Sequence, residues 1–147
     1  MRAAYAKSDN ATASIYGGWK RYSSAAYPSA THGGRYVQNY ADARAKSYGT
    51  YENGKAMPVG AQLAKDSFAV KANGQASIGP LFIMEKMQKG FNKASDDWRY
   101  TMVMPNGSVF GTTKGAGAAK VEFCIGCHQA GAERDSMLFL PEEYRVN

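Results

Sequence analysis

The sequence contains no apolar run long enough to cross a membrane. Its longest uninterrupted apolar stretch lies around residues 81–84, whereas a membrane-spanning helix needs roughly 20 apolar residues. Dense basic runs are also absent, although 18 lysines and arginines against 12 acidic residues give a net charge of +6. The positive residues are scattered singly, as on a solvated surface, which argues against a nucleic-acid partner. The charge is compatible with an acidic, soluble redox partner.

The chain has the size of one domain. Domains commonly contain about 100 to 150 residues, so residues 1–147 are expected to form a single unit. Hydrophobic residues make up 44% of the sequence and charged residues 20%. This composition excludes a disordered tail or a polar low-complexity array.

Cysteine is scarce, and both cysteines lie in one motif. Cys124 and Cys127 belong to the sequence Cys-Ile-Gly-Cys-His, which ends at His128 and has the spacing of c-type haem attachment. Each thiol can add to one haem vinyl group, and the adjacent imidazole can reach the iron. On a helix these positions fall at i, i+3 and i+4 and share one face. The motif therefore predicts one covalently bound haem c, with His128 as the iron ligand.

Two other interpretations of the motif are open. A redox disulfide between Cys124 and Cys127 would require a preceding strand in a βαβ setting, which the sequence does not indicate. A zinc site would need His32, the only other histidine. Adjacent residues such as Cys127 and His128 rarely both bind one tetrahedral ion. Haem attachment is the favoured interpretation.

The motif lies 19 residues from the C-terminus, which distinguishes between classes of cytochrome. Small electron carriers place it near the N-terminus and supply a methionine ligand much later, and here only Met137 follows. Four-helix cytochromes c′ have a C-terminal motif but are helical throughout. With 16 glycines and five prolines, the chain has too many helix breakers for a four-helix bundle.

Strand patterns dominate the middle of the chain. Alternating apolar and polar side chains predict strands at 62–71, 79–87 and 98–104, and Pro105-Asn106-Gly107 predicts a hairpin turn to residues 108–110. In the first of these strands, Lys65 shares a face with Leu63. The expected fold is α+β, a mainly antiparallel β-sheet with flanking helices and a C-terminal haem-attachment helix. A short strand at 35–41 and helices at 14–24 and 41–48 complete the expectation.

Several segments, in this order along the chain, resemble the cytochrome P-460 family, which includes the β-sheet cytochromes c′ (cytochrome c′-beta). The segments are His32–Val37, Gly60–Asp66, Gly79–Lys86, Asp97–Tyr100 and the haem motif, followed by Asp135 and Phe139. The resemblance implies a mono-haem c-type cytochrome domain that forms a homodimer.

The resemblance also implies a function in nitrogen-oxide chemistry. Family members oxidise hydroxylamine through iron-nitrosyl intermediates, at a haem whose meso carbon is bonded to a strand lysine. Lys65 stands at the position of that lysine. The c′-beta members lack this bond and bind nitric oxide under an aromatic cap. A cross-linked hydroxylamine oxidase is therefore expected, with a nitric-oxide binder and a simple electron-transfer cytochrome as alternatives.

Three further residues are candidates for the haem pocket. Phe82 stands where some family members have a proton-relaying carboxylate, so it is expected to cap the open iron site and to affect catalysis together with Lys65. Arg35 is a candidate partner of a haem propionate. His32 is expected to be a hydrogen-bonded surface group rather than an iron ligand.

Haem attachment of this type occurs outside the bacterial cytoplasm, so a periplasmic location is expected. The N-terminal residues lack an apolar signal-peptide core. The sequence is therefore interpreted as a mature form from which a signal peptide has been removed.

Overall fold

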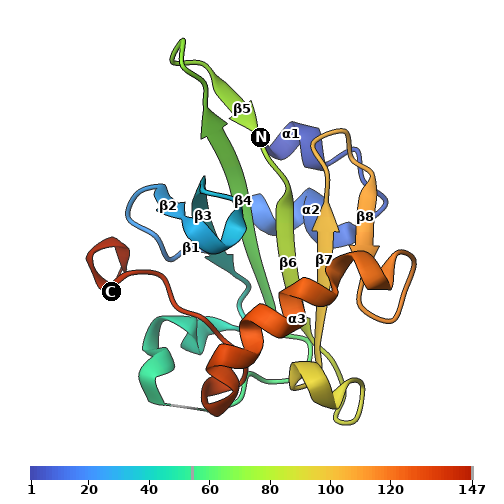
Figure 1. Ribbon diagram of the computed structural model, residues 1–147. Coiled ribbons are helices and arrows are strands. Elements are labelled where there is room, and N and C mark those ends of the chain that lie inside the picture. Colours follow the sequence, from blue (N-terminus) through green and yellow to red (C-terminus); the bar gives the residue numbers. More distant parts are fainter. Residues whose placement is uncertain (54, 147) are drawn as a thin grey trace.

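The computed structural model describes residues 1–53 and 55–146, which form an eight-stranded antiparallel sheet (Figure 1). The strands are β1 Lys20–Arg21, β2 Tyr27–Ser29, β3 Arg35–Ala41, β4 Gln62–Val70, β5 Ala76–Ile78, β6 Leu81–Lys86, β7 Trp98–Val103 and β8 Val109–Thr112. Their order is β1-β3-β4-β6-β7-β8, with β2 also paired to β3 and β5 to β4. The predicted α+β fold with a mainly antiparallel sheet is confirmed.

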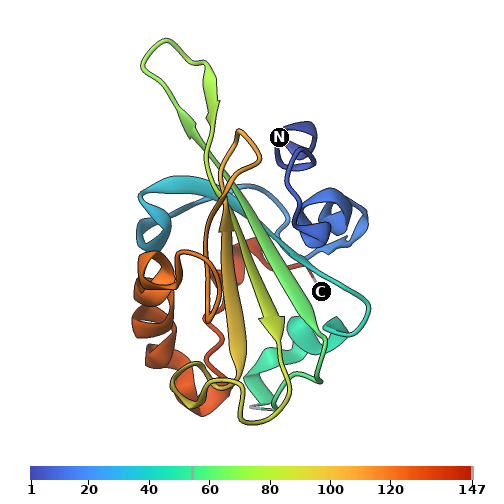
Figure 2. The same ribbon diagram turned by 90° about the vertical axis from the view of Figure 1, so that its right-hand side faces the viewer.

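Helices cover both faces of the sheet. The α-helices are α1 Arg2–Tyr5, α2 Ala11–Ile15 and α3 Glu122–His128, and 3₁₀-helices occupy Tyr16–Gly18, Ala30–His32, Lys46–Asn53, Lys93–Ser95, Ala118–Val121, Gln129–Arg134 and Glu142–Tyr144. Figure 2 shows α1 and α2 on one side of the sheet and the C-terminal helices on the other. The predicted C-terminal helix is confirmed. No helix of the described residues is long and apolar enough to span a membrane.

Both faces of the central strands are covered, and successive side chains point to opposite faces. In β6, Leu81 and Ile83 join the hydrophobic cluster under α1 and α2. Phe82 and Met84 line the opposite face, below the C-terminal helices. The larger cluster lies on that face and includes Val37, Leu63, Trp98, Tyr100, Met137 and Leu140. One sheet therefore separates two apolar cores.

The predicted helix at 14–24 is wrong beyond its first residues. Asn10 caps α2 by accepting a hydrogen bond from the third helical N–H, so the helix starts earlier than expected. Gly17 and Gly18 then disfavour continuation, because glycine loses more backbone entropy in a helix than other residues. Lys20–Arg21 pair with β3 instead.

The predicted helix at 41–48 is also wrong except at its end, where residues 46–48 begin the 3₁₀-helix Lys46–Asn53. Ala41 is the last residue of β3 and pairs with β4. The Asp42 carboxylate accepts hydrogen bonds from the backbone N–H groups of Ala45 and Gln62, at 2.9 and 3.1 Å. The Asp42 side chain thus joins the turn after β3 to the start of β4.

Candidate functional site

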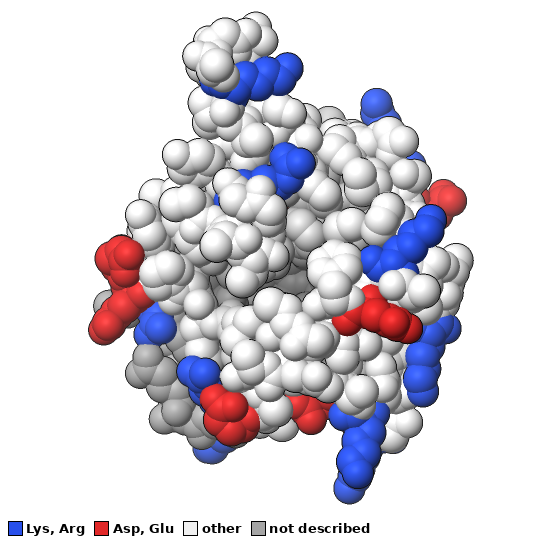
Figure 3. Space-filling model, in the orientation of Figure 1, with Lys and Arg blue, Asp and Glu red and all other residues white. Residues whose placement is uncertain are grey.

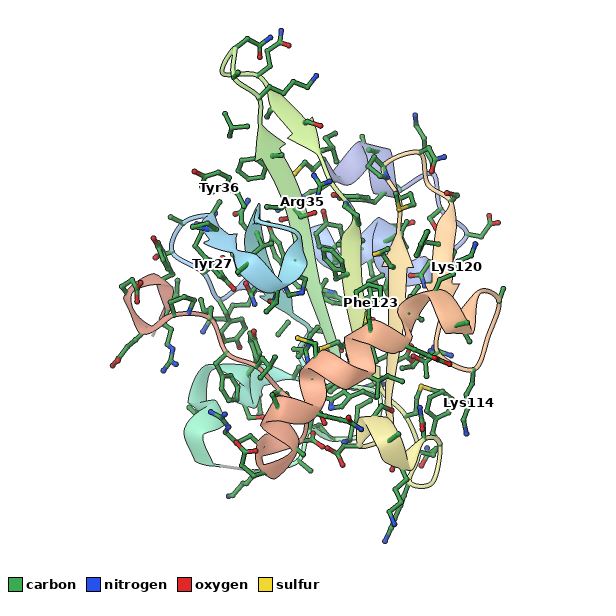
Figure 4. All side chains as sticks on the ribbon, in the orientation of Figure 1. Tyr27, Arg35, Tyr36, Lys114, Lys120 and Phe123 are labelled. Carbon is green, nitrogen blue, oxygen red and sulfur yellow. The ribbon has the colours of Figure 1, made fainter. Side chains whose placement is uncertain are left out.

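A cavity of about 270 Å³ lies between the sheet and the C-terminal helices. Strands β4, β6 and β7 form one wall, α3 with the segment after it forms the opposite wall, and the 3₁₀-helix Ala30–His32 closes one side. Figure 3 shows the surface hollowed near the middle of this face. Phe123 on α3 and Tyr27 on β2 also line the cavity (Figure 4). Apolar atoms dominate the lining, as is usual for cofactor sites.

Helix α3 brings the three motif residues to the cavity. Cys124, Cys127 and His128 all line it, which agrees with their expected common helical face. Neither cysteine is in a disulfide. Burial raises the pKa of the Cys124 thiol to about 11, whereas Cys127 is exposed. Both thiols and one imidazole are thus available to a molecule in the cavity.

His128 is held in one tautomer by the backbone. Its Nδ1 lies 2.8 Å from the carbonyl oxygen of Ser136. Because a carbonyl only accepts, Nδ1 must donate, and Nε2 keeps a free lone pair. Burial lowers the pKa of His128 to about 4, so the ring is neutral at pH 7. A neutral imidazole fixed in this way is a typical iron ligand.

The turn that presents the Ser136 carbonyl is anchored to the sheet by Asp135. Both residues have left-handed backbone angles, with φ of 58° and 53°. The Asp135 carboxylate forms an ion pair with Lys86 and accepts the backbone N–H of Met57 at 2.8 Å. The backbone carbonyl oxygen of Asp135 accepts a hydrogen bond from the indole N–H of Trp98 at 2.7 Å. Asp135 therefore ties the His128 side of the cavity to β6 and β7.

Replacing Asp135 with alanine is expected to lower the free energy of unfolding by about 3–5 kcal/mol, because the buried Lys86 ammonium loses its counter-ion. Urea unfolding of the haem-loaded protein measures this. Glu133→Ala is the control, since its ion pair with Arg134 lies at the surface and contributes little. A similar small effect for both variants would contradict the anchoring role of Asp135.

Lys65 and Phe82 lie directly opposite each other on the strand wall. They are register partners across β4 and β6, and both line the cavity. Lys65 is half-buried, and no hydrogen bond or ion pair joins its ammonium to another described residue. Desolvation lowers the pKa of Lys65 to about 8. The amine is thus mostly protonated at pH 7 but loses its proton more easily than an ordinary lysine, and it faces the space in front of the motif residues.

His32 is a cavity residue, although a hydrogen-bonded surface position was the favoured expectation for this candidate. It lines the cavity, and its ring packs edge-on against Phe82 with centroids 4.7 Å apart. Gly33 and Gly34 follow it with left-handed angles, φ of 73° and 66°. Glycine adopts such angles without strain, so the chain can turn here from the 3₁₀-helix Ala30–His32 into β3. The signals in the sequence were this glycine pair and the place of His32 in the segment His32–Val37, which resembles the family.

Arg35 does not line the cavity. Its side chain packs closely against Gly79, in the turn before β6. A Cβ added to Gly79 would lie only 2.9 Å from the Arg35 Cδ and 2.4 Å from the Ser67 hydroxyl oxygen. Figure 4 shows Arg35 at the start of β3, beside β4. A role toward a propionate stays a prediction.

The residues present fit a haem. An apolar cavity carries two thiols and a neutral imidazole with a free Nε2. The hydroxyl of Tyr100 is buried in the same place without a hydrogen-bond partner among the described residues. Buried hydroxyls are rarely unpaired, so this one indicates a polar group on a bound molecule.

The family model described as Cytochrome P460 matches residues 13–139, most of the chain. The chain belongs to the cytochrome P460 family. It is therefore a haem-binding cytochrome, as the ordered motifs of the sequence predicted. No curated protein matches the sequence. The match spans the strand wall with Lys65 and Phe82 as well as α3.

Proposed function

We propose that this P460-family cytochrome carries one haem c and oxidises hydroxylamine at a haem bonded to Lys65. The observation that carries the proposal is the position of the Lys65 amine. It lines the cavity opposite Phe82 and has no polar partner among the described residues. An ammonium left unpaired in such a place is costly. A bond from the neutral amine nitrogen to a haem meso carbon would remove the charge; it would replace one N–H and one C–H bond and pass two electrons to an oxidant such as a peroxide.

Cys124 and Cys127 are the proposed attachment points, and Nε2 of His128 is the proposed iron ligand. Their common place on the cavity wall supports this assignment. Attachment through thiols implies assembly outside the cytoplasm, so we also propose a periplasmic location. The net charge of +6 suits an acidic, soluble electron acceptor.

When bound, the haem supplies a redox centre that takes electrons from hydroxylamine and passes them on. Lys65 would tether β4 to the macrocycle and change its electronic properties. The lowered pKa of about 8 leaves part of the amine with a free lone pair for bonding. Phe82 would exclude water from the open face, because its ring lies on the wall of the cavity.

The second candidate is a nitric-oxide binder without the cross-link. The ring of Phe82 favours it, because it covers the strand side of the cavity. An apolar aromatic wall suits a small diatomic molecule better than it suits proton removal. In this version Lys65 stays a free amine.

One absorption spectrum of the reduced, haem-loaded protein separates the functions. A red-shifted band of the kind that names the family supports the cross-linked enzyme, and we expect this result because the Lys65 amine faces the cavity. An ordinary five-coordinate c-type spectrum supports the gas binder. A low-spin six-coordinate spectrum would contradict both and indicate an electron carrier.

A further inference from the structure

His32 has a defined orientation in the cavity. Its Nδ1 lies 2.8 Å from the Ser29 hydroxyl oxygen and 3.2 Å from that of Thr31. Its other nitrogen, Nε2, forms no hydrogen bond with any described residue. The edge-on contact with Phe82 fixes the plane of the ring on the strand side. One nitrogen is therefore held by hydroxyl groups, and the other is available to a ligand.

The imidazole of His32 is neutral. Burial, followed by the nearby Lys65 and His128, lowers its pKa to about 2. A neutral ring carries one proton, on either nitrogen. If a hydroxyl of Ser29 or Thr31 donates to Nδ1, the proton must be on Nε2. Both hydroxyl groups beside Nδ1 can rotate to donate to it, so the arrangement accommodates the tautomer with its proton on Nε2.

We propose that His32 donates a hydrogen bond from Nε2 to a polar ligand bound at the open face of the haem, with Ser29 as its positioning residue. The proposal rests on haem binding in this cavity and deepens the proposed function by specifying the ligand class. Such a donor favours hydroxylamine and small anions over apolar diatomic molecules. With its low basicity, His32 holds the ligand and does not remove its proton.

The test uses fluoride, which binds ferric haem and accepts hydrogen bonds strongly. We expect His32→Leu to weaken fluoride binding about tenfold to a hundredfold, the usual effect of one hydrogen bond to a charged group. His32→Gln should retain most of the affinity, because its side-chain amide can donate from nearly the same place. Ser29→Ala should give a smaller loss, whereas Ser108→Ala, in the turn before β8, is the matched control.

Carbon monoxide binding to the reduced protein is the comparison ligand. Because it is a poor hydrogen-bond acceptor, its affinity should change little in His32→Leu. Equal weakening of both ligands would show a packing effect and overturn the proposal. Unchanged fluoride affinity would also overturn it, as would conversion of a low-spin to a high-spin spectrum in His32→Leu, since His32 would then be an iron ligand.

Fluoride affinity requires haem but neither the Lys65 bond nor turnover. A protein without the cross-link can therefore still show the His32 effect, and a cross-linked enzyme can lack it. The two proposals fail on different measurements. Haem content and thermal unfolding of each variant establish that the fold is intact.

Discussion

Replacing Lys65 with leucine is expected to abolish most hydroxylamine oxidation and to restore an ordinary c-type spectrum, while nitric oxide still binds. Leucine fills the space of the lysine side chain but cannot bond to the haem. The fold should tolerate it, because the Lys65 ammonium has no partner among the described residues and leucine removes a desolvated charge. Lys71→Leu, at an exposed position just after β4, is the matched control and should keep full activity.

Peptide mapping tests the bond itself. In the haem-loaded wild type, trypsin should fail to cut after Lys65, since the modified side chain no longer fits the protease. The peptide with Lys65 should travel with the haem peptide of Cys124 and Cys127 as one branched species. Its mass should be lower than the summed parts by the hydrogens lost when the bond forms. A linear, unmodified Lys65 peptide from fully loaded protein would exclude the cross-linked enzyme and leave the nitric-oxide binder.

Replacing Phe82 with glutamate is expected to raise the rate of hydroxylamine oxidation by about 10² to 10⁴, the usual contribution of a positioned general base. The wild-type cavity offers a neutral His32 of very low basicity and an aromatic ring at this place. Neither can accept the protons that hydroxylamine must lose. A carboxylate in register with Lys65 would lie on the cavity wall and could do so.

Phe82→Gln separates basicity from shape. It has nearly the size of glutamate but cannot accept a proton at neutral pH, so it should leave the rate close to the wild-type value. Steady-state turnover and stopped-flow traces of all three proteins measure the difference. Equal rates for Phe82→Glu and Phe82→Gln, with haem intact, would contradict the place assigned to Phe82.

Residue spacing was sufficient to predict the features that depend only on neighbours along the chain. The motif from Cys124 to His128 predicted a helix with one reactive face, and α3 presents all three side chains to the cavity. The alternation around Lys65 and Phe82 predicted two strands, which are β4 and β6. A period of two requires only local backbone geometry, so it can be read without knowing the partner strand.

The two wrongly predicted helices show that strand pairing and side-chain hydrogen bonds can outweigh helix propensity. Residues 14–24 and 41–48 suit a helix by composition, but Lys20–Arg21 gain hydrogen bonds from an unpaired edge of β3. Asp42 satisfies two backbone donors with its own side chain. Both outcomes depend on groups far away in sequence or on side-chain geometry, which helix propensity does not include.

The haem motif, the places of the central strands and the common face of Leu63 and Lys65 could be predicted from the sequence, because each follows from residue spacing along the chain. The fold adds three features: His32 lies in the cavity, the Tyr100 hydroxyl has no partner among the described residues, and the turn held by Asp135 offers the Ser136 carbonyl to His128. These depend on long-range contacts, since β2, β7 and the C-terminal turn meet only when the sheet has formed. A side chain's burial and partners are set by that packing and not by its neighbours in sequence.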